Sequence, residues 1–239
     1  MKQLIIFAIL MPAAVAAEMP KLPAALQQAV PPGWAATYYA SGDLNGDKRA
    51  DAALIIQQQN PALRLKNEGL GADVLDTNPR RLLVLVRENK GYRLLAQSPD
   101  SLLPPQASLE APCLQDPLDE KAQDEAVIGI KRGRLWLNVS YWLSCGSYET
   151  QINRYQFRYQ NGVMRLIGAD GLSFSRASHD ESYYSANFLN GKVKMVTGVN
   201  QSRAEHHRPR ERWTQLARLP ETDLQRMQAL PEPWNNEND

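Results

Sequence analysis

A run of oxygen-bearing side chains between residues 43 and 51 is the part of the chain best suited to chemistry. Asp43, Asn45, Asp47 and Asp51 occupy relative positions 1, 3, 5 and 9 of this run. In a calcium loop, alternate side chains of a tightly curled backbone point toward one hard cation, and position 7 offers its main-chain carbonyl. Position 7 here is Arg49. The spacing therefore predicts a calcium site formed by these five residues.

The same segment also has an explanation without a metal. Asn45-Gly46-Asp47 is typical of a tight turn that is stabilised by bonds from side chains to the backbone. At position 12 stands Leu54, where an EF-hand has a bidentate Glu, and a strand-like run follows in place of a helix. The four spaced oxygens favour calcium over the bare turn, in a strand-loop-strand setting where the ion is structural.

The pattern Asp43-x-Asn45-x-Asp47-x-x-x-Asp51, followed by an apolar strand, resembles the calcium loop of the FG-GAP repeats found in integrin-type β-propellers and in many exported bacterial proteins. The resemblance implies that these four side chains are calcium ligands and that the loop pins two neighbouring strands. No second copy of the motif occurs, so the sequence does not support a complete repeat propeller.

Cys113 and Cys145 are the two cysteines of the chain. An even count in an exported chain predicts that they pair. The bridge would close a loop of about 30 residues, which the loop-entropy account values at roughly 3 to 4 kcal/mol. A catalytic thiol is the less favoured alternative, because no histidine stands in a recognisable catalytic signature.

No catalytic constellation is recognisable, and the sequence therefore predicts a protein that is not an enzyme. The segment 171–175 lacks the glycine spacing of a nucleophile elbow. His179-Asp180-Glu181 lies in a polar stretch where exposed charge is the default expectation. His206 and His207 are adjacent, so on a strand they would point to opposite faces and would not share one metal.

The charge balance argues against nucleic acid as a partner. The formal net charge is +1, whereas nucleic-acid binding leaves a footprint of clustered positive charge. The arginine-rich segment 203–212 also contains acidic residues, and we interpret it as a solvated loop or a sheet edge.

The first residues have the organisation of a secretory signal peptide. Lys2 precedes an apolar run that ends in Ala16-Ala17, a small-residue cleavage site, so we expect residues 1–17 to be removed. No other stretch approaches the roughly 20 apolar residues that span a bilayer. The sequence predicts a soluble periplasmic or secreted protein with no transmembrane segment after cleavage.

Residues 18–239 are expected to form a single β-rich domain. A short helix is predicted over 22–30 and another over 221–230, each ended by proline, and residues 60–78 and 98–124 are expected to be loops. Single strands are predicted over 34–39 and 52–56. Hairpins are predicted for 81–87 with 92–96, 126–130 with 135–142, 152–159 with 163–168, and 183–189 with 193–197.

This order of elements predicts a mainly β fold with antiparallel strands in a curved sheet, a sandwich or a partial propeller, and short helices near the two termini. Three classes of function stay open. The favoured one is a non-catalytic binding or accessory protein of the cell envelope, whose partner is another envelope protein or a glycan. The others are a periplasmic inhibitor or immunity protein with a projecting loop, and a hydrolase of unrecognised type. Five aromatic side chains are candidates for a binding face: Tyr141, Trp142, Tyr148, Tyr183 and Tyr184. We expect half or more of them to be core residues or cross-strand pairs instead.

Overall fold

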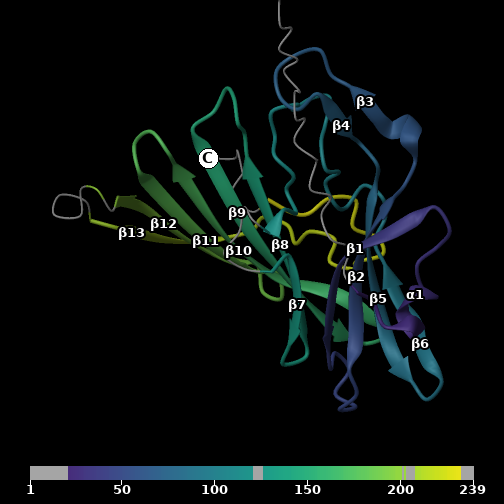
Figure 1. Cartoon of the computed structure of the whole chain (residues 1–239). Helices are drawn as coiled ribbons and strands as arrows, with labels where there is room; N and C mark the ends of the chain where they lie inside the picture. Colours follow the sequence, from purple (N-terminus) through teal and green to yellow (C-terminus); the bar gives the residue numbers. More distant parts are fainter. Residues whose placement is uncertain (1–20, 121–125, 201, 203–207, 233–239) are drawn as a thin grey trace, which may run out of the picture.

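A computed structural model describes residues 21–120, 126–200, 202 and 208–232, and it is mainly β with antiparallel sheets that are not closed (Figure 1). The predicted signal peptide lies outside the described residues. The elements are α1 (Ala24–Gln27), β1 (Trp34–Gly42), β2 (Asp51–Gln58), a 3-10 turn (Pro61–Leu63), β3 (Arg64–Lys66), β4 (Val74–Asp76), β5 (Arg80–Glu88), β6 (Gly91–Gln97), β7 (Ile128–Lys131), β8 (Arg134–Trp142), β9 (Glu149–Gln160), β10 (Val163–Ser175), β11 (Asp180–Asn187), β12 (Lys192–Asn200) and β13 (Arg210–Gln215).

In a four-stranded sheet with the order β1-β2-β5-β6, the central strands β2 and β5 are buried on both faces. Ile55 and its neighbours of the same face join the main core, while Leu54 and Ile56 pack with Leu26 of α1 on the other side. Strands buried on both faces need no polar alternation. This explains the unbroken apolar run 52–56 within β2, a strand whose first seven residues are all buried.

A seven-stranded sheet follows the chain order from β7 to β13, each strand antiparallel to the next (Figure 1). Buried and partly exposed side chains alternate along its strands: in β9, Tyr155 and Phe157 are fully buried, whereas Arg154 and Gln156, each of which precedes one of them, are partly exposed. The β9–β10 turn has positive φ at Asn161 and Gly162, as the sequence predicts. One face of this sheet therefore belongs to the core, and we call the opposite face the outer face.

The predicted helix over 221–230 is wrong, because this segment completes the sheet instead. β11 pairs with β10 only from Gly168 to Phe174. The amide of Leu166, before that stretch, donates to the carbonyl of Thr222 (2.8 Å), and the amide of Leu224 donates to the carbonyl of Met164 (3.0 Å). Satisfying these backbone groups and burying Leu224 outweighs the local helical pattern.

The structure also refines the predictions for the first helix and for the loop over 60–78. The first helix is confirmed but shorter than predicted, since only Ala24–Gln27 is α-helical. The expected loop over 60–78 contains the 3-10 turn and the β3–β4 hairpin, which lies apart from the two larger sheets (Figure 1). Among the described residues, no helix is long and apolar enough to cross a membrane.

Candidate functional sites: the aspartate loop, the disulfide and the outer sheet face

The aspartate loop connects β1 to β2, and Asp51 fixes its base. Asp51 is fully buried at the first position of β2. Its Oδ2 accepts the amide of Leu44 (2.8 Å) and its Oδ1 accepts the amide of Arg87 in β5 (2.8 Å). This carboxylate therefore ties the loop to the neighbouring strand through two charge-assisted hydrogen bonds.

The middle of the loop is held by Asp43 and Asn45. Asp43 accepts the amide of Gly46 on Oδ1 (2.7 Å) and the amide of Lys48 on Oδ2 (2.9 Å). Asn45 Oδ1 accepts the amide of Asp47 (3.0 Å). Gly46 and Lys48 both have positive φ, so the backbone is tightly curled, as the turn sequence predicts.

The side-chain carboxylate of Asp47 is paired with Arg49. Its Oδ1 accepts the Arg49 amide (2.8 Å), and its Oδ2 lies 2.8 Å from Arg49 Nη2. Bonds from Arg49 lower the pKa of this exposed carboxyl group. The sequence assigned only the carbonyl of Arg49 to the site, so it missed the guanidinium, which also donates to Asn89 in the β5–β6 turn (3.1 Å).

The five residues thus form one hydrogen-bonded loop, but they do not all converge. Among the described residues, no group of three or more acidic, histidine or cysteine side chains gathers closely enough to hold a metal. Asp51 has both oxygens committed to backbone amides. Asp43, Asn45 and Asp47 lie on one turn and retain acceptor capacity, since a carboxylate offers about four lone-pair sites. Such oxygens are the kind of ligand that a hard cation takes, and the Oδ2 of Asp47 already pairs with the Arg49 guanidinium.

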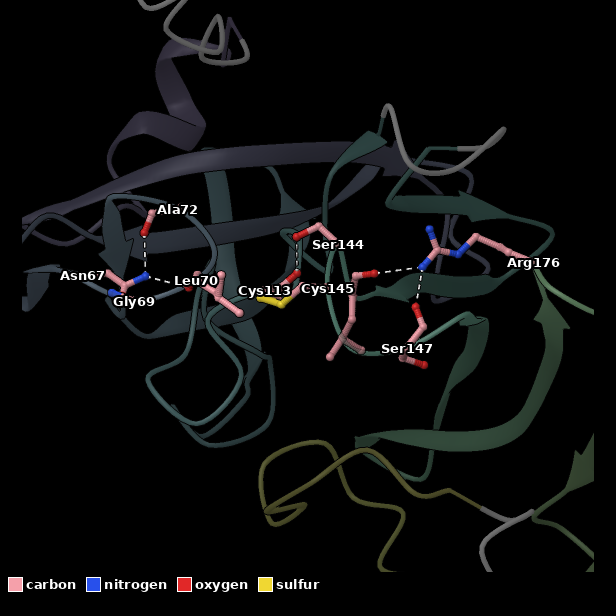
Figure 2. The surroundings of a disulfide bond; sticks show 10 residues. Asn67, Gly69, Leu70, Ala72, Cys113, Ser144, Cys145, Ser147 and Arg176 are labelled. Atoms are coloured by element: carbon pink, nitrogen blue, oxygen red, sulfur yellow. Dashed lines mark hydrogen bonds between the residues drawn. A yellow bond between two sulfur atoms is a disulfide. The ribbon is translucent and has the colours of Figure 1, made fainter.

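The predicted disulfide is confirmed. Cys113 and Cys145 are bonded, with their Cα atoms 5.6 Å apart and a separation of 32 positions in sequence (Figure 2). The bond joins the long loop after β6 to the β8–β9 connection. Ser144 adds two hydrogen bonds to the Cys113 carbonyl, one from its amide (2.8 Å) and one from its hydroxyl (3.0 Å).

Arg176, at the end of β10, braces the other side of the β8–β9 connection (Figure 2). Its Nη2 donates to the carbonyls of Leu143 (3.0 Å) and Ser147 (2.6 Å). Its guanidinium lies 5.1 Å from the centre of the Trp142 ring. The connection that carries Cys145 is therefore fixed to the seven-stranded sheet as well as to the long loop.

The long loop has a second anchor in a buried ion pair. Arg80 is only 2% exposed, and its Nη1 and Nη2 each lie 2.6 Å from an oxygen of Asp116. Asp116 also accepts the amide of Leu118 (2.9 Å). A buried arginine needs such a bidentate partner, because an unpaired charge in the core is strongly unfavourable. Nothing in the sequence pattern distinguished this pair from surface charges.

The outer face of the seven-stranded sheet carries an unusual row of side chains. Ile152, Leu172, Tyr183 and Val196 are consecutive cross-strand partners from β9 to β12. Ile152 is 37% exposed and Tyr183 39% exposed. We call these four residues the apolar row. Contiguous apolar side chains on a solvent-facing sheet are typical of interaction surfaces.

The predicted aromatic binding residues divide as expected between core and surface. Trp142, Tyr148 and Tyr183 are exposed. Tyr184 is buried and donates its hydroxyl to Asn153 Oδ1 (2.6 Å), and burial raises the pKa of its hydroxyl group. Tyr141 packs against the core, where burial raises the pKa of its hydroxyl group to about 12.

The structure also bears on two polar segments that the sequence predicts to be exposed. Glu181, expected to be exposed, is buried on the outer face, where the Tyr183 hydroxyl donates to it. Arg210–Gln215 is an edge strand, in agreement with one interpretation of the arginine-rich segment. His206 and His207 lie outside the described residues.

No known protein family, characterised protein or solved structure matches the chain.

Proposed function

We propose that this chain is an exported, non-catalytic binding protein that works in an oxidising compartment of the cell envelope. The observation that carries the proposal is the apolar row on the outer face. Its four members stand side by side on four neighbouring strands, although water-facing positions of an antiparallel sheet are usually polar. Another macromolecule of the envelope covers this row in the bound state.

The disulfide supports export. Disulfides persist in oxidising compartments and are rare in the cytosol, where thiols are kept reduced. Both cysteines of this chain form one disulfide, which holds the loop after β6 against the β8–β9 connection of the seven-stranded sheet. The bond therefore stiffens the element that presents the apolar row.

Calcium has a structural role in this proposal. The turn that carries Asp43, Asn45 and Asp47 is already closed by its own hydrogen bonds, so the fold does not depend on the ion. Calcium adds stability by binding the folded loop, and a ligand at a hundred times its Kd adds about 2.7 kcal/mol. Raising calcium should increase the melting temperature over a chelator control, and Asp47→Ala should abolish the increase. An unchanged melting temperature in the wild-type protein, together with no heat of calcium binding in calorimetry, would refute the metal assignment.

Binding through the apolar row is tested by sedimentation with washed envelope fractions of the expressing bacterium. Wild-type protein should sediment with the envelope, and Ile152→Asp or Tyr183→Asp should weaken this association at least tenfold. Tyr148→Asp is the matched control, because Tyr148 is 68% exposed but lies outside the row. Failure of the wild type to associate, or equal losses in all three variants, would contradict the proposal.

A second candidate function, an inhibitor with a projecting loop, is favoured by the tip of the β3–β4 hairpin. Leu70 at this tip is 73% exposed. Asn67 Nδ2 donates to the carbonyls of Leu70 (2.9 Å) and Ala72 (3.0 Å), so the tip is held in one shape beside the disulfide (Figure 2). A rigid loop loses little entropy on entering a cleft. Leu70→Asp would abolish inhibition of an envelope hydrolase in this alternative and leave the envelope association intact in the first proposal.

A further inference from the structure

Basic side chains gather at one end of the outer face, around the β7–β8 turn. Lys131 and Arg132 are exposed in or beside this turn, and Arg134 begins β8. The side chains of these three residues form no ion pair with any carboxylate among the residues that the structure describes. The net charge of the whole chain is only +1, so this concentration of positive charge is local.

The arginines continue across the sheet in direct register. Arg134 of β8 stands opposite Arg158 of β9, and Arg158 stands opposite Arg165 of β10. All three point to the outer face, because their neighbours Leu135, Phe157 and Leu166 are core residues. Like charges in directly opposite positions destabilise a sheet. Arg165 has the carboxylate of Glu221 near it, so Arg134 and Arg158 are the pair whose repulsion an anionic ligand would relieve.

Arg134 of this row, together with Lys131 and Arg132 of the β7–β8 turn, borders a cavity of about 640 Å³. Its lining includes four cationic side chains and, among the described residues, no carboxylate: Lys131, Arg132, Arg134 and Arg154, with Trp136 and Gln156 between them. The carboxylate nearest in register is Asp170, opposite Arg154, and it accepts hydrogen bonds from Gln156 (2.8 Å) and Ser185 (2.6 Å). This volume lies within the range of small-molecule sites.

Trp136 supplies a flat wall to the cavity. It stands opposite Gly129 of β7, and a Cβ atom at Gly129 would lie 2.0 Å from the indole ring. The missing side chain is what allows the ring to lie against strand β7. An aromatic face beside planar guanidinium groups suits a ring-shaped ligand that also carries a carboxylate or a phosphate.

We propose that this cavity binds an anionic saccharide unit, a sugar acid or sugar phosphate, with the arginines holding the charged group and Trp136 packing on the sugar ring. The inference rests on the proposed envelope-binding function, because it names a ligand for the basic end of the same outer face. A saccharide is favoured over nucleic acid, since the lining of the cavity offers one aromatic ring, Trp136, whereas a single-stranded nucleic acid is held by several successive stacking platforms.

The test is calorimetry on the full-length mature protein with oligogalacturonate of about six units as the acidic probe, glucose 1-phosphate as the phosphate probe and maltohexaose as the neutral control. At least one anionic probe should bind, and maltohexaose should not. The double variant Arg132→Gln with Arg134→Gln should weaken binding at least tenfold. Arg210→Gln, which removes an exposed arginine at the opposite edge of the sheet, should leave Kd within twofold. Melting temperatures of the variants show whether they remain folded.

Several outcomes would overturn the inference. These are no binding of either anionic probe, equal binding of maltohexaose, or equal loss in the Arg210→Gln control. Tighter binding of a single-stranded DNA hexamer or of polyglutamate would show that the cavity serves a different class of polyanion. Envelope association that depends on Tyr183 while both saccharide probes fail would reject this inference alone, and loss of both would reject the proposed function as well.

Discussion

The four-stranded and seven-stranded sheets share antiparallel pairing but bury their faces differently. In the first, the central residues 52–56 of β2 and 82–86 of β5 are all apolar and buried, and they pack against the main core on one face and the α1 side on the other. In the second, one face joins the core while the outer face carries the apolar row at its centre and arginines at one end. Strands enclosed on both sides serve mainly to support the fold, whereas a sheet with a free face is also available to a ligand.

The largest expected effect is a loss of stability on truncating a core isoleucine, compared with the same change in the apolar row. Ile55→Ala should lower the free energy of unfolding by about 4 kcal/mol, since Ile55 is fully buried in the core between the sheets. Ile152→Ala, the same change in the apolar row, should cost only about 0.5 kcal/mol through lost cross-strand contacts. Urea denaturation followed by circular dichroism measures both. Equal losses would mean that the outer face is as tightly packed as the core, and the comparison would fail.

Loss of the disulfide should come next. Replacing Cys113 and Cys145 together with alanine should destabilise the protein by roughly 3 to 4 kcal/mol, because the closed loop of 32 residues gains entropy in the unfolded state. Native-state hydrogen exchange should show the largest increase at the end of β8, beside the bond, and the smallest in β2. Ser144→Ala is the control, as it removes one hydrogen bond to the Cys113 carbonyl and keeps the bridge. A loss spread evenly over both sheets would show that the bond does not act locally.

Local patterns predicted much of this fold. The alternation in β8 and β9 and the Asn161-Gly162 turn identify the hairpins of the seven-stranded sheet, and the apolar run of β2 identifies a buried strand. The sequence could not distinguish the two sheets, because which strands share a sheet depends on contacts far apart in the chain. The segment 221–230 shows the limit clearly: its local pattern is helical, but distant backbone groups of β10 decide its structure.

The candidate sites show the same limit. The disulfide followed from counting, since two cysteines have one possible partner each. The spacing of Asp43, Asn45, Asp47 and Asp51 identified the loop, but not that Asp51 is committed to the amides of Leu44 and Arg87. The arginine row was invisible in the sequence, because Arg134, Arg158 and Arg165 become neighbours only through strand register.

Two aspartates of the loop sharpen the comparison between enclosed and exposed regions. Asp51→Ala leaves the buried amide of Leu44 and the partly buried amide of Arg87 without acceptors, and it should cost about 2 to 3 kcal/mol. Asp43→Ala also removes the acceptor of two amides, but in an exposed turn where water replaces it, so its cost should be well under half as large. Chemical denaturation in the presence of a chelator measures both without a contribution from calcium. Equal costs would show that burial of Asp51 adds nothing to its role.

The smallest effect concerns the exposed edge of the outer face, where Glu211 of β13 lies 2.7 Å from Lys194 Nζ and accepts a hydrogen bond from Trp213 Nε1 (2.7 Å). The Lys194 bond, followed by that of Trp213, lowers the pKa of the Glu211 carboxyl group. With the folded-state pKa below the unfolded one, any stabilisation from this pair is present above the unfolded pKa and is lost as the pH falls through the folded pKa. Because both side chains are solvated, the change should be visible as a titration midpoint in NMR and not as a shift in melting temperature.

Lys194→Met should raise the Glu211 midpoint toward its ordinary value, and added salt should do the same in the wild-type protein. A midpoint that responds to neither change would mean that the edge pair does not form in solution, and that the outer face is more mobile at this edge than the enclosed sheet.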